Sequence, residues 1–390
     1  MANAKQLVET ALNAGKGVFR LEPAWVPRSF CIPGRRLKLH PNDYYAYGAN
    51  RGGIDERWFS STTKADNGPL TTPHEGLSFI HVDNGNGDSR VLLKDALEIA
   101  GDEILGKEVM QKYGGWKMYS KFFDNEEPLP HHVHHTDAMA AKVGRSGKPE
   151  AYYFPKQLNN HGGYFPYTFF GLNPGTSKDE VKACIRNWEK ADNGILYLSR
   201  AYKLQPGTGW DVPPGILHAP GSLLTYEPQA ASDVFAMFQN IVWEAYTPKE
   251  LLQKDIPDES KDDADYYVDL LDWELNVDPD FYANRYMAPQ PVGPIEAMRA
   301  DGYEEYDIVY KSPCFSAKEL TILPGCSALI KDDGPYGAIV IQGQGSFGAL
   351  DVEAPAMIRF GQMTSDELFV TAQAAKEGVL IKNTSPTDEL

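Results

Sequence analysis

Four of the nine histidines in the chain stand at positions 131, 132, 134 and 135, inside the stretch "EEPLPHHVHHTDAM". Histidine is the commonest protein ligand for divalent transition metals. On a strand, residues i and i+2 point to the same face, so His132 and His134 would share one face while Val133 points to the other. The pair fits a metal site and a solvated polar loop about equally well, so further ligands are needed to decide.

Two later segments supply further ligand types. Glu150 stands just before an aromatic, strand-like run in "GKPEAYYFP", and His218 follows a Pro-Pro-Gly turn in "GWDVPPGILHAPGSLLTYEPQ". Taken singly, Glu150 is better explained as a solvated charge and His218 as a loop histidine. Together with His132 and His134 they form a set of three imidazoles and one carboxylate, which suits Zn, Fe, Mn or Ni with positions open for substrate.

The elements that must position these residues are predicted to be mostly short strands. Glycine (35 residues) and proline (28 residues) are spread through the chain and separate many alternating apolar runs, a pattern typical of sandwiches and barrels. Helical periodicity is predicted over about 3–15, 91–112, 178–190 and 248–274, with Thr176 or Ser177 as the cap of the third helix. The predicted fold class is therefore all-β dominated.

Residues 247–290 form the most acidic stretch, which is predicted to be helical and to separate two β units. We expect residues 1–246 to form an N-terminal extension and a metal-binding unit, and residues 291–390 to form a second unit. The C-terminal range contains no histidine. We therefore expect that unit to be metal-free and structural.

The composition narrows the class of partner. A net charge of −17 disfavours nucleic acids and anionic membranes, because both are bound through clustered Lys and Arg. No stretch approaches the ~20 apolar residues that cross a bilayer, the N-terminus lacks the apolar core of a secretory signal, and the four cysteines form no Cys-x-x-Cys pair. We expect a cytoplasmic monomer or homodimer that acts on a small molecule.

The order of the motifs resembles that of a known family. His-x-His, then Glu, then a distant His resembles the cupin metal motif, and three segments in order resemble the type I phosphomannose isomerases: "GWKMYSKFFDNEEPLPHHVHHTDAMAAKVG", "GKPEAYY" and "PPGILHAPGSLLTYEPQ". An earlier segment, "GANRGGIDERWFSST", is similar to a further region of that family. The resemblance covers most of residues 45–245. It implies two cupin (jelly-roll) β-barrels with helical insertions and an N-terminal extension.

Carried over residue by residue, the resemblance implies one divalent metal ion held by His132, His134, Glu150 and His218. Zinc is the first expectation. Because His132 stands where the family has Gln and makes the site richer in imidazole, Fe, Mn and Ni are alternatives.

The resemblance also implies that Lys121, Lys148 and Glu227 line the active site and act in catalysis. Lys148 is two residues before Glu150, which on a strand places both on one face. Glu227 is nine residues after His218, and we expect both on one strand and hairpin, facing one cavity. The alternatives are a solvated Lys148 and a surface Glu227 in a turn before Pro228.

The implied function is a metal-dependent aldose–ketose isomerase of the mannose-6-phosphate isomerase type, acting on a sugar or sugar phosphate through a cis-enediol. This reaction needs a base for the carbon-bound proton and an electrophile for the developing negative oxygen. Two alternatives stay open: an Fe-dependent cupin oxygenase, which the third histidine favours, and a non-catalytic sugar-binding cupin.

One departure from the family bears on the substrate. The family carries an Arg on the strand after the second histidine segment, whereas "QAASDVFAMFQNIVWE" contains no basic residue. We therefore expect a less anionic substrate, unless Arg51, Arg57, Lys142 or Arg145 folds over the site. For the stretch around Arg51, Glu56 and Arg57 we expect a buried Arg–Glu pair against Trp58, because buried charges need partners.

Overall fold

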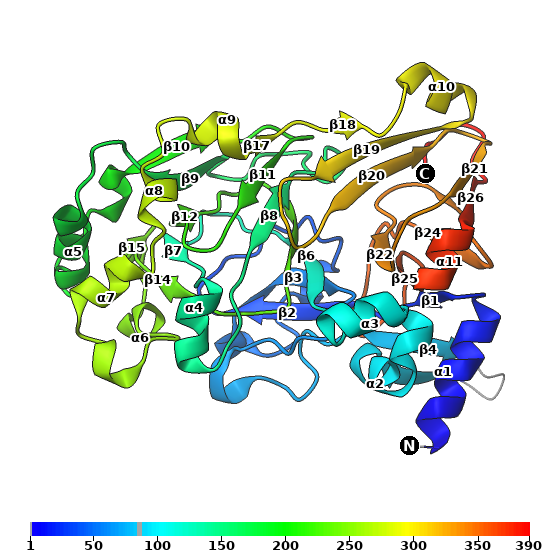
Figure 1. Ribbon diagram of the computed structural model, residues 1–390, viewed down its shortest axis with the longest axis horizontal. Coiled ribbons are helices and arrows are strands. Elements are labelled where there is room, and N and C mark those ends of the chain that lie inside the picture. The colour runs from blue at the N-terminus through cyan, green and yellow to red at the C-terminus, as the bar shows by residue number, and fades with distance from the viewer. Residues whose placement is uncertain (1, 84–87) are drawn as a thin grey trace.

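The computed structural model describes residues 2–83 and 88–390. Its described part is rich in sheets, and its strand ladders are antiparallel (Figure 1). The predicted all-β-dominated class is therefore confirmed, whereas two closed barrels stay a prediction. No helix among the described residues has the length and apolar character needed to cross a membrane.

Two sheets lie around the histidine segment. The first has seven strands in the order β17 (Tyr286–Met287), β11 (Gly209–Val212), β8 (Glu150–Tyr153), β13 (Thr225–Ala230), β6 (Met118–Phe123), β3 (Gly53–Phe59) and β2 (Ala24–Arg28). The second has five strands in the order β10 (Ser199–Lys203), β9 (Tyr167–Leu172), β12 (His218–Ala219), β7 (His132–Val133) and β14 (Ala236–Met237).

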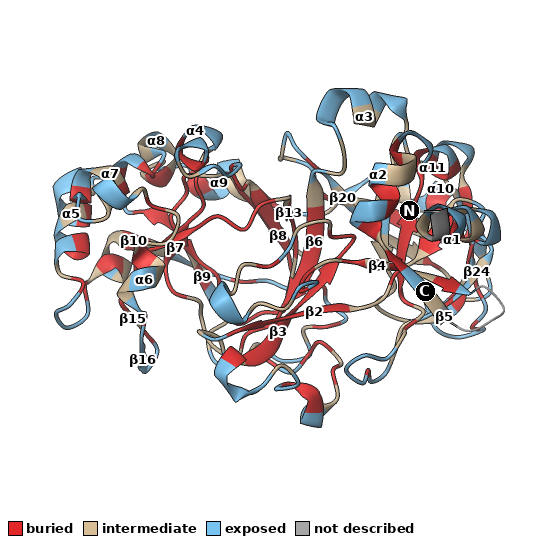
Figure 2. Cartoon of the chain, turned by 90° about the horizontal axis from the view of Figure 1, so that it is seen from below, coloured by how far each residue is buried: buried red, intermediate tan, exposed pale blue. Residues whose placement is uncertain are grey.

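The register of the seven-stranded sheet sorts its side chains between two faces. Lys121 of β6 is paired with Glu227 of β13, and Gln229 of β13 is paired with Glu150 of β8. Because alternate residues share a face, these four polar side chains belong to one face of the sheet. Figure 2 shows β3 and β6 buried along most of their length, so this polar face is covered by protein.

The C-terminal range builds three smaller sheets: β1 (Val18–Arg20), β25 (Glu367–Val370) and β22 (Tyr336–Ile339); β18 (Gln290–Pro291), β19 (Tyr303–Val309) and β20 (Ala317–Ile322); and β21 (Ser327–Ile330), β26 (Val379–Asn383), β23 (Gln344–Phe347) and β24 (Leu350–Glu353). β1 pairs with β25, so a strand near the N-terminus lies in a C-terminal sheet. Two ribbons remain, β4 (Phe79–Asp83) with β5 (Asp88–Leu92) and β15 (Ile241–Val242) with β16 (Ala245–Tyr246). The division into 1–246, 247–290 and 291–390 stays a prediction.

The helices are short and lie outside the sheets (Figure 1). They are α1 (Ala2–Ala14), α2 (Leu93–Ile104), α3 (Lys107–Tyr113), α4 (Asp137–Ala140), α5 (Lys178–Arg186), α6 (Lys249–Leu252), α7 (Ala264–Asp269), α8 (Trp273–Asn276), α9 (Phe281–Arg285), α10 (Ile295–Ala300) and α11 (Ala372–Glu377).

Two of the four predicted helices differ from the structure. The helix predicted over 91–112 is interrupted at Gly106, whose φ of 81° lies in a region that glycine tolerates and other residues avoid. The helix predicted over 248–274 is three short helices instead, α6 to α8, with Pro257 and further turns between them.

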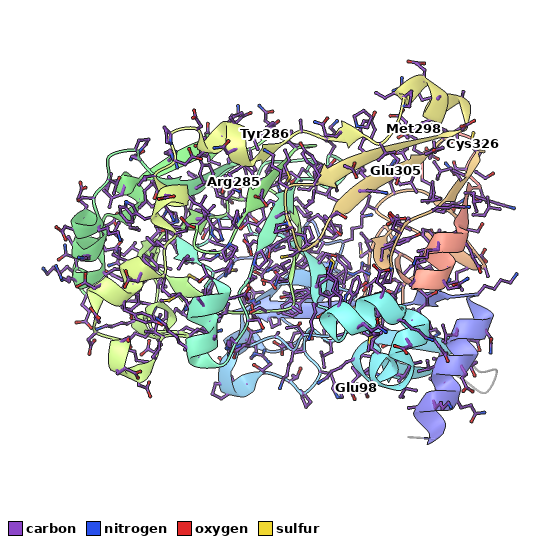
Figure 3. The ribbon with its side chains drawn as sticks, in the orientation of Figure 1. Glu98, Arg285, Tyr286, Met298, Glu305 and Cys326 are labelled. Atoms are coloured by element: carbon purple, nitrogen blue, oxygen red, sulfur yellow. The ribbon has the colours of Figure 1, made fainter. Side chains whose placement is uncertain are left out.

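The acidic segment returns to the seven-stranded sheet at its end. Figure 3 labels Arg285 and Tyr286, where α9 leads into β17. Arg285 donates to Asp211 of β11 over 2.8 Å, and Tyr286 is paired with Trp210 in the ladder. This end of the segment is thereby held against the sheet that carries Glu150.

Candidate metal centre

Three of the predicted ligands come together through the five-stranded sheet. His132 of β7 and His218 of β12 are direct partners in the ladder, and their ring centroids lie 4.2 Å apart. His134 follows β7, and its ring lies 5.0 Å from that of His132. One ring nitrogen from each of the three lies within 4.8 Å of the others.

Backbone carbonyls fix which nitrogen of each ring is free. Nδ1 of His132 is 2.7 Å from the carbonyl of Pro130, and Nδ1 of His218 is 2.8 Å from that of Ile216. Nδ1 of His134 is likewise 2.8 Å from a carbonyl, that of Val234. Because a carbonyl only accepts, each Nδ1 carries a proton, and in a neutral ring Nε2 is then the atom with the lone pair. This is how ligand histidines are oriented around a metal ion.

Glu150 completes the cluster from the seven-stranded sheet. Its carboxylate oxygens lie 2.9 Å from Nε2 of His134 and 3.1 Å from Nε2 of His218. The hydroxyl of Tyr152, two residues further along β8, donates to Glu150 over 2.6 Å. The sequence analysis did not single out Tyr152, although its i+2 spacing from Glu150 was the available signal.

The chemistry of this donor set fits a divalent cation. The three rings and Glu150 are at most 6% exposed, and Nε2 of His218 has no hydrogen-bond partner of ordinary geometry. Burial lowers the pKa of His134 to about 4 and the pKa of His132 well below its ordinary value, so both rings are neutral. Three converging imidazoles and a carboxylate are a donor set that a divalent transition metal takes. The cluster is therefore a candidate site for one divalent metal ion.

The other two histidines of the run face elsewhere. Nε2 of His131 bonds to the hydroxyl of Ser199, and Nε2 of His135 lies 3.0 Å from the carbonyl of Asp255. Strand alternation thus divides the run between the cluster and its surroundings, as the His-x-His spacing predicts.

The predicted catalytic residues lie beside the cluster. Nζ of Lys148 is 3.1 Å from Glu150 and 3.8 Å from Glu227. Nζ of Lys121 is 3.2 Å from Glu227 and 3.4 Å from Glu56. All five side chains are buried, so their charges interact strongly.

The carboxyl group of Glu227 has an unusually high pKa. Burial, followed by the charge of Glu150, raises the pKa of Glu227 to about 8 in spite of the two lysines. The expectation that Glu227 shares a strand with His218 is wrong, because His218 lies in β12 of the five-stranded sheet and Glu227 in β13 of the other. Glu227 is connected to the cluster through Lys148, which lies 3.8 Å from Glu227 and 3.1 Å from Nε2 of His134.

The buried charges continue beyond the predicted residues. Glu56 accepts hydrogen bonds from Arg28 over 3.1 Å and from the indole of Trp58 over 2.6 Å. Arg28 also lies 3.3 Å from Asp233. The predicted Arg–Glu pair next to Trp58 therefore exists, but its arginine is Arg28, which the sequence did not single out.

Comparisons with known proteins agree with this architecture. No family model and no curated protein sequence matches the chain. Among solved structures, mannose 6-phosphate isomerase from Bacillus subtilis is similar at 20% identity and a TM-score of 0.62, over 94% of this chain and 97% of that chain. A zinc-bound mannose 6-phosphate isomerase is similar at 14% identity and a TM-score of 0.60, over 95% and 97%.

A phosphomannose isomerase variant from Salmonella typhimurium is similar at 14% identity and a TM-score of 0.59, over 96% of this chain and 98% of that chain. The chain has the fold of the mannose-6-phosphate isomerases. The resemblance predicted from the motifs is thereby confirmed at the level of the fold, over nearly the whole chain.

Proposed function

We propose that this protein is a metal-dependent aldose–ketose isomerase and that zinc is its preferred metal ion. The observation that carries the proposal is the convergence of three imidazole lone pairs and Glu150, with Lys148, Lys121 and Glu227 in the same buried layer. The similarity to a zinc-bound mannose 6-phosphate isomerase supports the choice of metal and reaction.

A divalent ion held by His132, His134, Glu150 and His218 would polarise the carbonyl and neighbouring hydroxyl oxygens of a sugar. Glu227 takes the proton from C2 of the aldose and returns it to C1, which leaves a ketose. A pKa of about 8 suits this exchange, because a base works best when its pKa is close to the working pH.

We assign the proton transfer between the two sugar oxygens to the lysines. In the same reaction one proton must pass from the C2 hydroxyl to the C1 oxygen. Lys148 contacts both Glu150 and Glu227 and would carry this proton. Lys121, 3.2 Å from Glu227, holds that carboxyl in place and stabilises its charged form.

The experiment is proton NMR of the zinc-loaded protein with mannose, fructose and lyxose in deuterated water. We expect interconversion of aldose and ketose with deuterium entering C1 or C2. Glu227→Gln should lower the rate by at least about 100-fold, the usual contribution of a general base. The same measurement is made with mannose 6-phosphate, and no exchange with any of these sugars, free or phosphorylated, would contradict the proposal.

The three-histidine donor set favours a second candidate, an Fe-dependent cupin oxygenase. Metal analysis of protein purified without added metal, combined with oxygen uptake, separates the two functions. Bound iron, together with oxygen consumption in the presence of a sugar or another organic substrate, would contradict the isomerase proposal and support the oxygenase.

A further inference from the structure

We infer that the candidate site takes an unphosphorylated sugar, whose hydroxyls are recognised by Gln229 and Tyr119. The inference rests on the proposed function and names its substrate class. It is carried by two sets of contacts: the cations around the cluster are already paired, and two neutral polar groups on the same sheet face are not.

The two lysines beside the cluster are each shared between carboxylates of the chain. Lys148 lies within 3.8 Å of both Glu150 and Glu227, and Lys121 lies within 3.4 Å of both Glu227 and Glu56. A phosphate would have to compete for them with carboxylates that are fixed in place and equally buried. Lysine also lacks the planar fork with which arginine grips a phosphate at two points.

Among the described residues, Arg28 is the one arginine that contacts the carboxylates shared with these lysines. Its guanidinium group is already paired with carboxylates of the chain. It lies 3.1 Å from Glu56 and 3.3 Å from Asp233, and it is only 4% exposed. Arg28, Lys121 and Lys148 together face four carboxylates, so each of these cations already has an opposite charge beside it.

The four basic residues that the sequence left as possible phosphate ligands are engaged elsewhere. The structure pairs Arg51 with Glu75, Arg57 with Asp366, Arg145 with Asp66 and Asp255, and places the ammonium of Lys142 over the ring of Tyr266.

The strand next to the ligands offers no positive charge to a phosphate either. β14 pairs with β7, and Met237 stands opposite His132. Met237 is 3% exposed and packs in an apolar cluster, and residues 227–244 contain no Lys or Arg. A phosphate placed against this strand would lose its hydration without gaining donors.

Gln229 is the first of the two groups that we expect to bind a sugar hydroxyl. It is paired with Glu150 in the sheet, and its side-chain nitrogen donates to the carbonyl of Ser232 over 2.9 Å. This bond orients the amide, so Oε1 is the free atom, and it is buried without a partner. An oxygen that only accepts repels a phosphate dianion but fits the O–H of a sugar.

Tyr119 is the cross-strand partner of Gln229, and its hydroxyl is also buried without a partner. Both residues are fully buried on the face that carries Lys121 and Glu150. Buried polar groups are costly unless a bond satisfies them, and sites built around neutral hydrogen bonds discriminate strongly between substrates.

The first test compares kcat/KM of the zinc-loaded protein for mannose, fructose, lyxose and mannose 6-phosphate. We expect a free sugar to exceed mannose 6-phosphate by at least about tenfold. A clear preference for mannose 6-phosphate would overturn the inference and leave the isomerase intact.

The second test measures binding alone, by calorimetry with mannitol and mannitol 1-phosphate, which have no carbonyl and cannot isomerise. Mannitol should bind at least as tightly as its phosphate, and this result decides the inference even if no sugar is turned over. Tighter binding of mannitol 1-phosphate would overturn it.

Gln229→Met keeps the shape of the side chain but removes both the acceptor and the donor to Ser232. We expect it to weaken mannitol binding about tenfold with zinc content retained, and to lower the melting temperature because the carbonyl of Ser232 loses its buried partner. The matched control is Gln290→Met on the exposed strand β18, which should change nothing. Unchanged mannitol binding in Gln229→Met would remove Gln229 from sugar recognition. Tyr119→Phe tests the hydroxyl in the same way.

Discussion

At the scale of single residues, the direction of each imidazole decides the chemistry of the cluster. Nδ1 of His218 is tied to the carbonyl of Ile216, so only Nε2 is free to bind a metal. We predict that His218→Ala loses stoichiometric metal while the sheets persist, because one ligand is removed from a site surrounded by an extensive core. Elemental analysis after dialysis measures this, with the exposed His161→Ala as control. Full metal occupancy in His218→Ala would show that the cluster is not the metal site.

The hydroxyl of Tyr152 is the second residue-scale case. It donates to Glu150 over 2.6 Å, whereas its neighbour Tyr153 points to the other face and donates to Glu319. We predict that Tyr152→Phe weakens metal affinity by about 10–100-fold, because the bond orients a ligand carboxylate. Titration against a chelator measures the affinity. Tyr153→Phe is the matched control, and equal losses in both variants would contradict the prediction.

At the scale of elements, local sequence signals determine the residue at which a helix begins. Ser177 accepts from the backbone of Glu180, whose carboxylate bonds back to Ser177, forming a capping box at the start of α5. We predict that Ser177→Ala costs about 1 kcal/mol locally and speeds amide exchange in α5 about fivefold. Mass-spectrometric hydrogen exchange of residues 178–186 measures this. The adjacent Thr176→Ala should leave the exchange unchanged, and an effect of equal size there would argue against the cap.

At the scale of the whole molecule, buried ion pairs join distant parts of the chain. Arg57 of β3 contacts Asp366 over 2.7 Å and Glu367 over 3.4 Å, at the start of β25. We predict that Arg57→Met destabilises the protein by about 3–5 kcal/mol, because two buried carboxylates lose their cation. Urea unfolding followed by circular dichroism measures the change. Arg359→Met, which breaks a surface pair with Asp43, is the control and should have little effect.

The sequence by itself determined which residue types meet and, through the order of the motifs, the fold in which they meet. His132 and His134 were readable because strand alternation is a local property. Glu150 and His218 were assigned through the order of the motifs, which resembles that of the phosphomannose isomerases. Ser177, one of the two residues predicted to cap the helix at 178, was readable for the same local reason. The interruption at Gly106 was not foreseen, because an apolar periodicity continues across it.

Only the tertiary structure decided how the charges are paired. Arg28 and Asp233 lie 205 positions apart, and Arg57 and Asp366 lie 309 positions apart. No local pattern marks such partners, because a buried charge accepts any opposite charge that the packing of the chain brings within reach. The same reason applies to Glu227, which is connected to His134 through Lys148 from a different sheet. It also applies to Gln229, whose free oxygen depends on the carbonyl of Ser232 that accepts from its nitrogen.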